Sequence, residues 1–288
     1  MLSQLYSASP EIAPATGTEG PRYCVLGPVT MVRDGRPCTP SALKQRALLA
    51  LLLLSANVPV PAHRLIEGLW GSRPPQAAAA TLQVYVSCLR RALDPAHGAA
   101  NRDPRHHPLL RTEATGYRMR VAPGELDLDR FRTLTATGRR HLAEGRCQQA
   151  GEALGEALAL WRGRPFADLE HSGLLGSYGV RLEEERLSAL GDHMDVVLCR
   201  GRSHEVVDVI GELRELCAAH PLRESFHETL IRALCRVGRR AEALTAYTRV
   251  RGMLIAELGI EPGPGLKAAQ LVALEAREPY GIGHLRCR

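Results

Sequence analysis

The chain has 288 residues, enough for two domains that each bury a core. Hydrophobic residues make up 45% and charged residues 24%, a balance that excludes fibrous and largely disordered chains. The net charge of +6 is uneven, because residues 21–120 hold 14 Lys or Arg against 5 Asp or Glu while residues 121–288 hold 23 against 24. A basic half of this kind is the electrostatic pattern of a phosphate-backbone binder.

The two ends are expected to be tails. Residues 1–20 are rich in Ser, Ala, Pro, Gly and Thr and lack the charged and apolar parts of an export signal, and a second tail is expected over residues 277–288. The eight cysteines are scattered without a Cys-x-x-Cys spacing, which favours reduced thiols over a disulfide framework. The longest apolar run, Ala47–Leu54, is too short to span a bilayer. These features indicate a cytoplasmic protein, associated with the nucleoid if it binds DNA.

Residues 21–122 have the element order of a winged helix-turn-helix domain. Short strands between Tyr23 and Cys38 turn at Asp34-Gly35, a strong hairpin signal. Loop residues 95–108 separate the helices from a second hairpin that turns near Thr115-Gly116. Between the hairpins, periodicity predicts three helices over Ala42–Leu54 with Ser41 as its cap, around Ala62–Leu69, and from about Pro75 to Leu93.

The second hairpin is predicted over Leu109–Thr112 and Tyr117–Val121. Its last strand has an apolar face of Tyr117, Met119 and Val121 and a basic face of Arg118 and Arg120. The apolar face can pack on the helices, which would leave both arginines free to reach phosphates.

Residues 123–276 change to helical periodicity broken by Gly-Arg and Pro. Gly145, Gly201 and Gly238 are each followed by Arg and then by an amphipathic helix. The last two glycines are 37 residues apart, near the tetratricopeptide period. The predicted fold class is therefore mainly α with small antiparallel β elements: a winged helix-turn-helix domain followed by an all-α tetratricopeptide-like repeat domain.

The third predicted helix has an unusual outer face. Its core stripe is Ala78, Leu82, Val86, Leu89 and Leu93. The opposite side carries small apolar, hydroxyl, amide and guanidinium side chains where a solvated face would carry mostly Lys and Glu. A major groove accepts such a set, because an amide pairs with adenine and a small apolar group touches a thymine methyl. The alternative is that this face packs on another protein segment.

Several motifs in order give the chain a family resemblance. The first half carries Leu69–Gly71, Pro74-Pro75, Thr81–Leu93 and Thr115–Arg118, and the second half Leu158–Gly163, Arg181–Arg186, His220–Glu224 and Glu257–Pro262. With these motifs, residues 22–276 resemble the Streptomyces antibiotic regulatory protein family. That resemblance implies an OmpR-like winged helix joined to a bacterial transcriptional activation domain.

The resemblance also implies roles for individual residues. The third helix would be the recognition helix, and the first helix carries a matching basic pair. Glu113, near the turn of the wing, departs from the basic residue often found there. The implied DNA-binding residues are Gln83, Val84, Ser87 and Cys88 toward bases; Thr81, Arg90 and Arg91 toward the backbone; Tyr85 on the same helix; Lys44 and Arg46 on the first helix; and Arg111, Thr115, Tyr117 and Arg118 in the wing.

The expected function is therefore a transcriptional activator of an antibiotic or other specialised-metabolite gene cluster. By resemblance it would bind promoter direct repeats, as two protomers head to tail, and recruit RNA polymerase through the sigma and alpha subunits. The sequence carries no catalytic motif, so we expect no enzyme activity and no cofactor, and His97, Asp103, His106 and His107 lack a metal-ligand spacing. Two alternatives stay open, a helical-repeat scaffold for protein binding and a ligand-controlled repressor.

Overall fold

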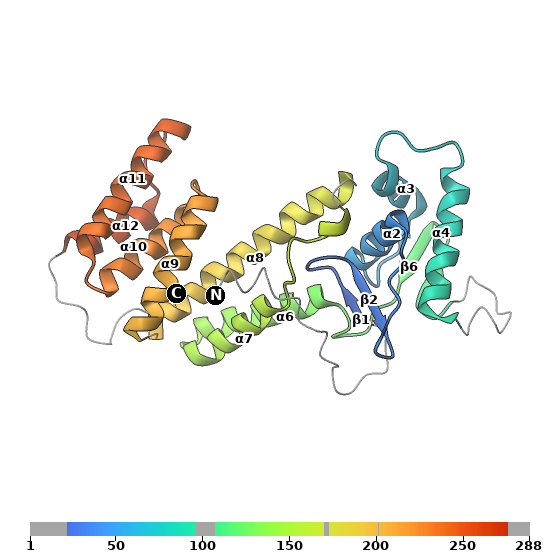
Figure 1. Cartoon of the computed structure of the whole chain (residues 1–288), viewed down its shortest axis with the longest axis horizontal. Coiled ribbons are helices and arrows are strands. Elements are labelled where there is room, and N and C mark those ends of the chain that lie inside the picture. Colours follow the sequence, from blue (N-terminus) through green and yellow to red (C-terminus); the bar gives the residue numbers. More distant parts are fainter. Residues whose placement is uncertain (1–21, 96–106, 170–172, 201, 276–288) are drawn as a thin grey trace. The chain divides into compact units, whose positions relative to one another are not determined.

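The computed structural model describes residues 22–95, 107–169, 173–200 and 202–275 (Figure 1), which divide into two compact units. The sheet unit comprises the described residues up to Thr133 together with Ala159–Arg186, and the helical unit comprises Leu134–Leu158 and the residues from Leu187 onward. Both predicted tails lie outside the described residues. Within the described part of the chain, no helix is long and apolar enough to cross a membrane.

Two small antiparallel sheets belong to the sheet unit. The first has the order β1 (Arg22–Cys24), β2 (Thr30–Arg33) and β3 (Arg36–Pro37). Asp34 and Gly35 have φ values of 49° and 72°, so the predicted tight hairpin at this dipeptide is confirmed. The second sheet has the order β4 (Val60–Pro61), β6 (Gly116–Met119) and β5 (Leu110–Thr112). The sequence did not indicate β4, because two residues ending in proline give no strand signal.

Three helices pack against one another in the sheet unit: α2 (Leu43–Leu54), α3 (Ala62–Trp70) and α4 (Ala78–Leu93). In the sequence they lie between β3 and β5. Two predicted helix starts are wrong. Ala42, not Ser41, is the residue before α2, and no side chain caps that helix. Pro75 lies before α4 and not in its first turn, because its carbonyl closes a turn by accepting the Ala78 N–H at 2.9 Å.

The helical unit confirms the predicted all-α region. Helices α6 (Asp127–Ala143) and α8 (Gly173–Arg200) contribute residues to both units. The other helices of this unit are α7 (Cys147–Ala159), α9 (Ser203–Ala219), α10 (Glu224–Arg236), α11 (Arg240–Leu258) and α12 (Pro264–Leu274). Helix α10 packs against α9, α11 and α12 (Figure 1).

The two predicted Gly-Arg breaks that the structure describes share one backbone conformation. Gly145 and Gly238 have φ values of 73° and 78°, a left-handed backbone that glycine adopts without a Cβ penalty. In both breaks the following arginine donates its N–H to a carbonyl five residues earlier, at 2.8 Å. The repeat therefore exists as a shared helix ending, while Gly201 lies outside the described residues.

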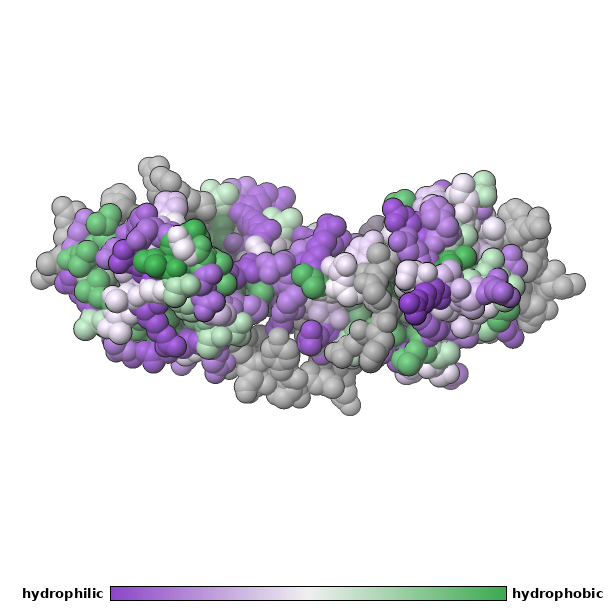
Figure 2. Space-filling model, turned by 90° about the horizontal axis from the view of Figure 1, so that it is seen from above, coloured by the Kyte–Doolittle hydropathy of each residue, from purple (hydrophilic) through white to green (hydrophobic). Residues whose placement is uncertain are grey.

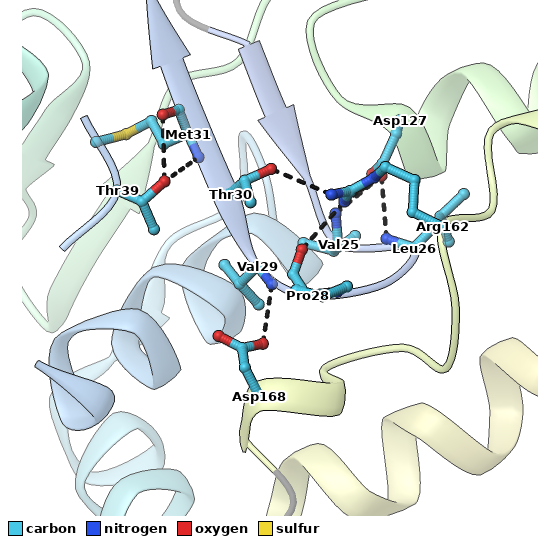
Figure 3. Close-up of polar contacts among 10 residues, drawn as sticks. All are labelled: Val25, Leu26, Pro28, Val29, Thr30, Met31, Thr39, Asp127, Arg162 and Asp168. Carbon is cyan, nitrogen blue, oxygen red and sulfur yellow. Dashed lines mark hydrogen bonds and ion pairs between the residues drawn. The ribbon is translucent and has the colours of Figure 1, made fainter. Parts of the chain in front are cut away.

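A group of charged side chains holds the first sheet to later residues of the sheet unit (Figure 3). We call Asp127, Arg162 and Asp168 the charge clamp. Asp127 accepts the N–H of Val25 at 2.9 Å and of Leu26 at 3.0 Å. Its carboxylate also lies 3.6 Å from the Arg162 guanidinium, which donates to the Pro28 carbonyl at 3.1 Å. The turn between β1 and β2 is thus fastened by residues more than 100 positions further along the chain.

Asp168, in the short 3-10 helix Ala167–Leu169, completes the clamp. Its carboxylate accepts the Val29 N–H at 3.0 Å and pairs with Arg46 of α2 at 2.8 Å. Asp127 is only 7% exposed, and this burial raises the pKa of its carboxyl to about 6 despite opposing hydrogen bonds from Leu26 and Val25 and the nearby Arg162 charge.

Candidate nucleic-acid interface

The two faces of α4 are those that the periodicity predicted. Leu82, Val86 and Leu89 are at most 1% exposed and belong to the core of the sheet unit, as do Ala78 and Leu93. On the other side Gln83, Val84, Ser87 and Arg91 are exposed. Val84 is 58% exposed in mid-helix, where a folding role would bury it. The exposed side of α4 therefore offers an amide, a small apolar group, a hydroxyl and a guanidinium to a partner.

Side chains of the two preceding helices, α2 and α3, support α4 through a stack that ends on Tyr85. The rings of Tyr85 and Trp70 stack at a centroid distance of 6.1 Å and an interplanar angle of 18°. The Lys44 ammonium lies 6.0 Å from the Trp70 ring centroid and donates to the Leu69 carbonyl. Tyr85 and Lys44, both predicted DNA contacts, thus already have partners within the sheet unit.

The remaining predicted residues of α4 differ in exposure. Thr81 is half-buried and its hydroxyl donates to the carbonyl of Ala77 at 3.0 Å, one turn earlier. Cys88 is half-buried, and its Sγ accepts a contact from the Arg91 guanidinium at 3.5 Å. Arg91 is therefore exposed but oriented along its own helix, beside the positions predicted to face bases.

Two of the arginines predicted to contact DNA have partners within the sheet unit. Arg46 pairs with Asp168 of the charge clamp. Arg90 donates from Nε to the Leu110 carbonyl at 2.9 Å and from Nη2 to the Thr112 hydroxyl at 2.7 Å. Their role as DNA contacts stays a prediction, and sequence periodicity gave no sign of these internal partners.

The wing is the hairpin of β5 and β6. Tyr117, Met119 and Val121 are buried, which confirms the predicted apolar face, and Arg111, Thr115 and Arg120 are exposed. Arg118, predicted to be free, is not, because its Nε lies 3.1 Å from the Glu113 carboxylate across the hairpin. Arg111 and Arg120 are thus the exposed cations of the wing.

The first residue of β6, next to the turn of the wing, requires a glycine. Gly116 of β6 faces β4, and a Cβ at this position would overlap the Val60 carbonyl oxygen. The close approach lets β4 join the sheet beside α3, so β4 holds the hairpin next to its turn, whose residues Ala114 and Thr115 remain exposed.

His107 is a structural residue that sequence reasoning missed. It is 1% exposed and hydrogen-bonds the backbones of α4 and β5. His97, Asp103 and His106, weighed with it as metal ligands, lie outside the described residues. Among the residues that the structure does describe, no group of three or more His, Cys, Asp or Glu could hold a metal ion.

Comparison with known proteins covers both halves of the chain. Residues 126–272 match the family model of the bacterial transcriptional activator domain, and residues 39–119 match that of the C-terminal domain of transcriptional regulatory proteins. Regulatory protein DnrI of Streptomyces peucetius is 37% identical over 88% of this chain and 91% of its own length. Regulatory protein AfsR of Streptomyces coelicolor is 40% identical over 88% of this chain, which spans only 24% of AfsR.

A solved structure agrees with this likeness. EmbR of Mycobacterium tuberculosis, in complex with a low-affinity phosphopeptide, has a TM-score of 0.78 and 35% sequence identity, over 88% of this chain and 65% of EmbR. The proteins named here are regulatory proteins, and the described fold has the same order of a winged-helix-like domain and a helical domain.

Proposed function

The chain belongs to the Streptomyces antibiotic regulatory protein family of transcriptional regulators, and on this basis we propose that it binds duplex promoter DNA through α4 and activates a specialised-metabolite gene cluster. The observation that carries the proposal is the exposed face of α4, with Gln83, Val84, Ser87 and Arg91.

Each of these side chains suits one kind of contact in a major groove. The Gln83 amide can pair with the N6 and N7 edge of adenine, and Val84 can touch a thymine methyl. Ser87 can donate to or accept from a base edge. Arg91, one turn further along, suits a phosphate and would position the helix without reading sequence.

The charge around α4 also supports DNA binding by this helix. Residues 21–120 carry a balance of nine positive charges, from 14 basic and 5 acidic residues, which attracts a polyanion. The wing adds exposed Arg111 and Arg120 beside this helix in the sheet unit. Because Glu113 offsets Arg118, we propose Arg111 as the wing cation that reaches DNA, with Arg118 in a supporting role.

We further propose that the helical unit makes the activating contacts, with the sigma and alpha subunits of RNA polymerase. Its stacked helices offer an extended surface of the type that helical-repeat proteins use to bind partners. On the promoter, two protomers would lie head to tail on direct repeats spaced about one helical turn, roughly 10 to 11 base pairs, apart.

The test begins with duplexes selected by the full chain from a randomised pool. Affinity for a selected duplex and for an unrelated duplex is measured over a series of salt concentrations. Arg91→Ala should weaken both and reduce the slope of log affinity against log salt by about one charge. Arg140→Ala, an exposed arginine in α6 of the helical unit, is the matched control and should leave affinity and slope unchanged.

Gln83→Ala supplies the complementary arm, because a lost base contact changes sequence preference and leaves the salt slope intact. No salt-dependent binding of the wild-type chain to any duplex would refute the DNA-binding proposal. Binding without stimulation of transcription from a reconstituted promoter would refute the activator role alone.

A further inference from the structure

Two side chains connect the recognition helix to the wing. Arg90, in the last turn of α4, donates to the Leu110 carbonyl at 2.9 Å and to the Thr112 hydroxyl at 2.7 Å, both on β5. His107 lies 3.2 Å from the Arg90 carbonyl through Nε2 and contacts the N–H groups of Leu109 and Leu110 through Nδ1 at 3.2 and 3.1 Å. We call Arg90, His107 and Thr112 the helix–wing brace.

The partners of His107 define its protonation. Nδ1 faces two backbone N–H groups, so it must act as an acceptor and carry no proton. The ring proton therefore sits on Nε2, which donates to the Arg90 carbonyl. With 1% exposure and both nitrogens engaged, the imidazole is a neutral connector that fixes the end of α4 against the first residues of β5.

Arg90 connects the same two elements through its own side chain. Its guanidinium has a planar fork, and two of its donors point to a carbonyl and a hydroxyl two residues apart on β5. A lysine has the same charge but a single ammonium, so it cannot reproduce this pair of directed contacts. The geometry thus depends on the fork of the guanidinium more than on its charge.

We propose that Arg90 and His107 are positioning residues that set the recognition helix relative to the wing, and that they govern sequence discrimination without touching DNA. This inference rests on the proposed function. Base contacts need the helix and the wing in register with two grooves at once, whereas phosphate contacts tolerate small displacements. Loosening the brace should therefore weaken binding to a selected duplex and spare binding to unrelated DNA.

The first experiment compares two substitutions that preserve local chemistry. In Arg90→Lys the charge stays and the fork is lost. In His107→Asn the side-chain oxygen can still accept the Leu109 and Leu110 N–H groups, but the shorter side chain cannot reach the Arg90 carbonyl. Each variant should bind the selected duplex about tenfold more weakly, bind unrelated duplex as the wild type does, and keep the wild-type salt slope.

Arg140→Lys is the matched control, since it makes the same change at an exposed position of α6 in the helical unit, outside the proposed DNA-binding face. It should stay within about twofold of wild type for both duplexes, because it alters neither a proposed DNA contact nor the brace. If Arg90→Lys behaves like this control while Arg90→Ala flattens the salt slope by about one charge, then Arg90 is a phosphate contact and the brace is rejected.

A double-mutant cycle tests the brace without DNA. Thr112→Val removes the hydroxyl that accepts from Arg90 and changes no charge, at an exposed strand position. In thermal unfolding of the full chain, Arg90→Lys and Thr112→Val should be non-additive, the second change having a smaller effect once the first is made. Strict additivity would overturn the inferred brace.

The outcomes separate the two proposals. A wild-type chain that binds no duplex, with the unfolding cycle still coupled, refutes the proposed function and leaves the brace as a structural junction. Normal binding with an uncoupled cycle and unchanged discrimination refutes the brace and leaves the proposed function standing.

Discussion

The exposed face of α4 and the charge clamp both carry polar side chains of the sheet unit, but they differ in exposure to solvent and in hydrogen-bond partners. On α4, Gln83, Ser87 and Arg91 are exposed, with a solvent-facing valine among them. In the clamp, Asp127 is buried and accepts two backbone N–H groups from residues about 100 positions away. The first arrangement leaves polar groups available to a partner, whereas the second satisfies them within the fold.

This difference separates recognition from folding within one basic unit. Changes on the α4 face should alter what the protein binds and leave its stability nearly intact. Changes in the clamp should alter stability, because a charge stripped of its partner stays buried. The space-filling view (Figure 2) shows hydrophilic and hydrophobic residues intermixed on the face that it draws.

The largest effect is expected from cutting the chain at the domain boundary that the sequence indicates. A fragment of residues 22–123 lacks all three residues of the charge clamp and the buried Leu126, Leu128 and Phe131. We expect it to lose cooperative unfolding in calorimetry, because the N–H groups of Val25, Leu26 and Val29 lose their partners.

A fragment of residues 22–186 is the control, since it contains the whole sheet unit. It should unfold cooperatively. Equal cooperativity of the shorter fragment would mean that the winged helix is independent of the clamp and that the boundary near residue 122 is a true folding boundary.

The next effect concerns one carboxylate of the clamp. Asp127→Ala should lower the free energy of unfolding by about 3 to 5 kcal/mol, because Arg162 loses its charge partner and two buried N–H groups lose their acceptor. Asp129→Ala, two residues along the same helix and exposed, should cost less than about 1 kcal/mol. Urea unfolding of both variants measures the difference, and equal losses would show that the clamp does not hold the first sheet.

The pH dependence of stability gives a slightly smaller effect. Burial raises the pKa of Asp127 from 3.8 to about 6, so the folded chain binds this proton more tightly than the unfolded chain. The stability that this group contributes is therefore full below about pH 3.8 and lost as the pH rises through 6, a change of about 3 kcal/mol. Asp127→Asn cannot ionise and lacks the change.

The free energy of unfolding of the wild type minus that of Asp127→Asn should accordingly fall by about 3 kcal/mol between pH 3.5 and 7. A rise over this interval would mean that the Arg162 ion pair outweighs desolvation and lowers the pKa of the carboxyl instead.

The contrast also explains what the sequence could predict. The stripe of Leu82, Val86 and Leu89 and the apolar face of β6 follow from periodicity, which is a local property, and both predictions are confirmed. The Asp34-Gly35 turn is local as well. The family motifs, several in order, identified both halves of the chain, and the comparisons confirm that identification.

What the sequence could not predict are the contacts between distant residues. Nothing in the sequence near Asp127 or Asp168 signals that their partners are N–H groups on the turn before β2. The sequence predicted a polar loop around His107. Its burial depends on the end of α4 and the start of β5 lying close together in the fold. Arg90 was interpreted as a phosphate contact because its acceptors, Leu110 and Thr112, belong to a strand beyond the loop that follows α4. Glu113, the partner of Arg118, lies in the same hairpin, and the sequence showed it there but not the ion pair.

The smallest expected change in stability is at Val84, and it tests the recognition face most directly. Val84 and Val86 are two residues apart on α4, but the first is 58% exposed and the second 1%. Val86→Ala should cost about 2 kcal/mol, because two buried methyl groups are lost from the core. Val84→Ala should cost less than about 0.5 kcal/mol, since no core contact is removed.

Binding should respond in the reverse order. If Val84 touches a thymine methyl, Val84→Ala weakens binding to the selected duplex, and the same loss appears when that thymine is replaced by uracil, which lacks the methyl group. Combining the protein and DNA changes should then add nothing further, because both remove one contact. Val86→Ala, by contrast, should bind normally at temperatures where it is folded. A Val84→Ala protein that unfolds, or one that binds every selected duplex as the wild type does, would place this side of α4 against protein and not against DNA.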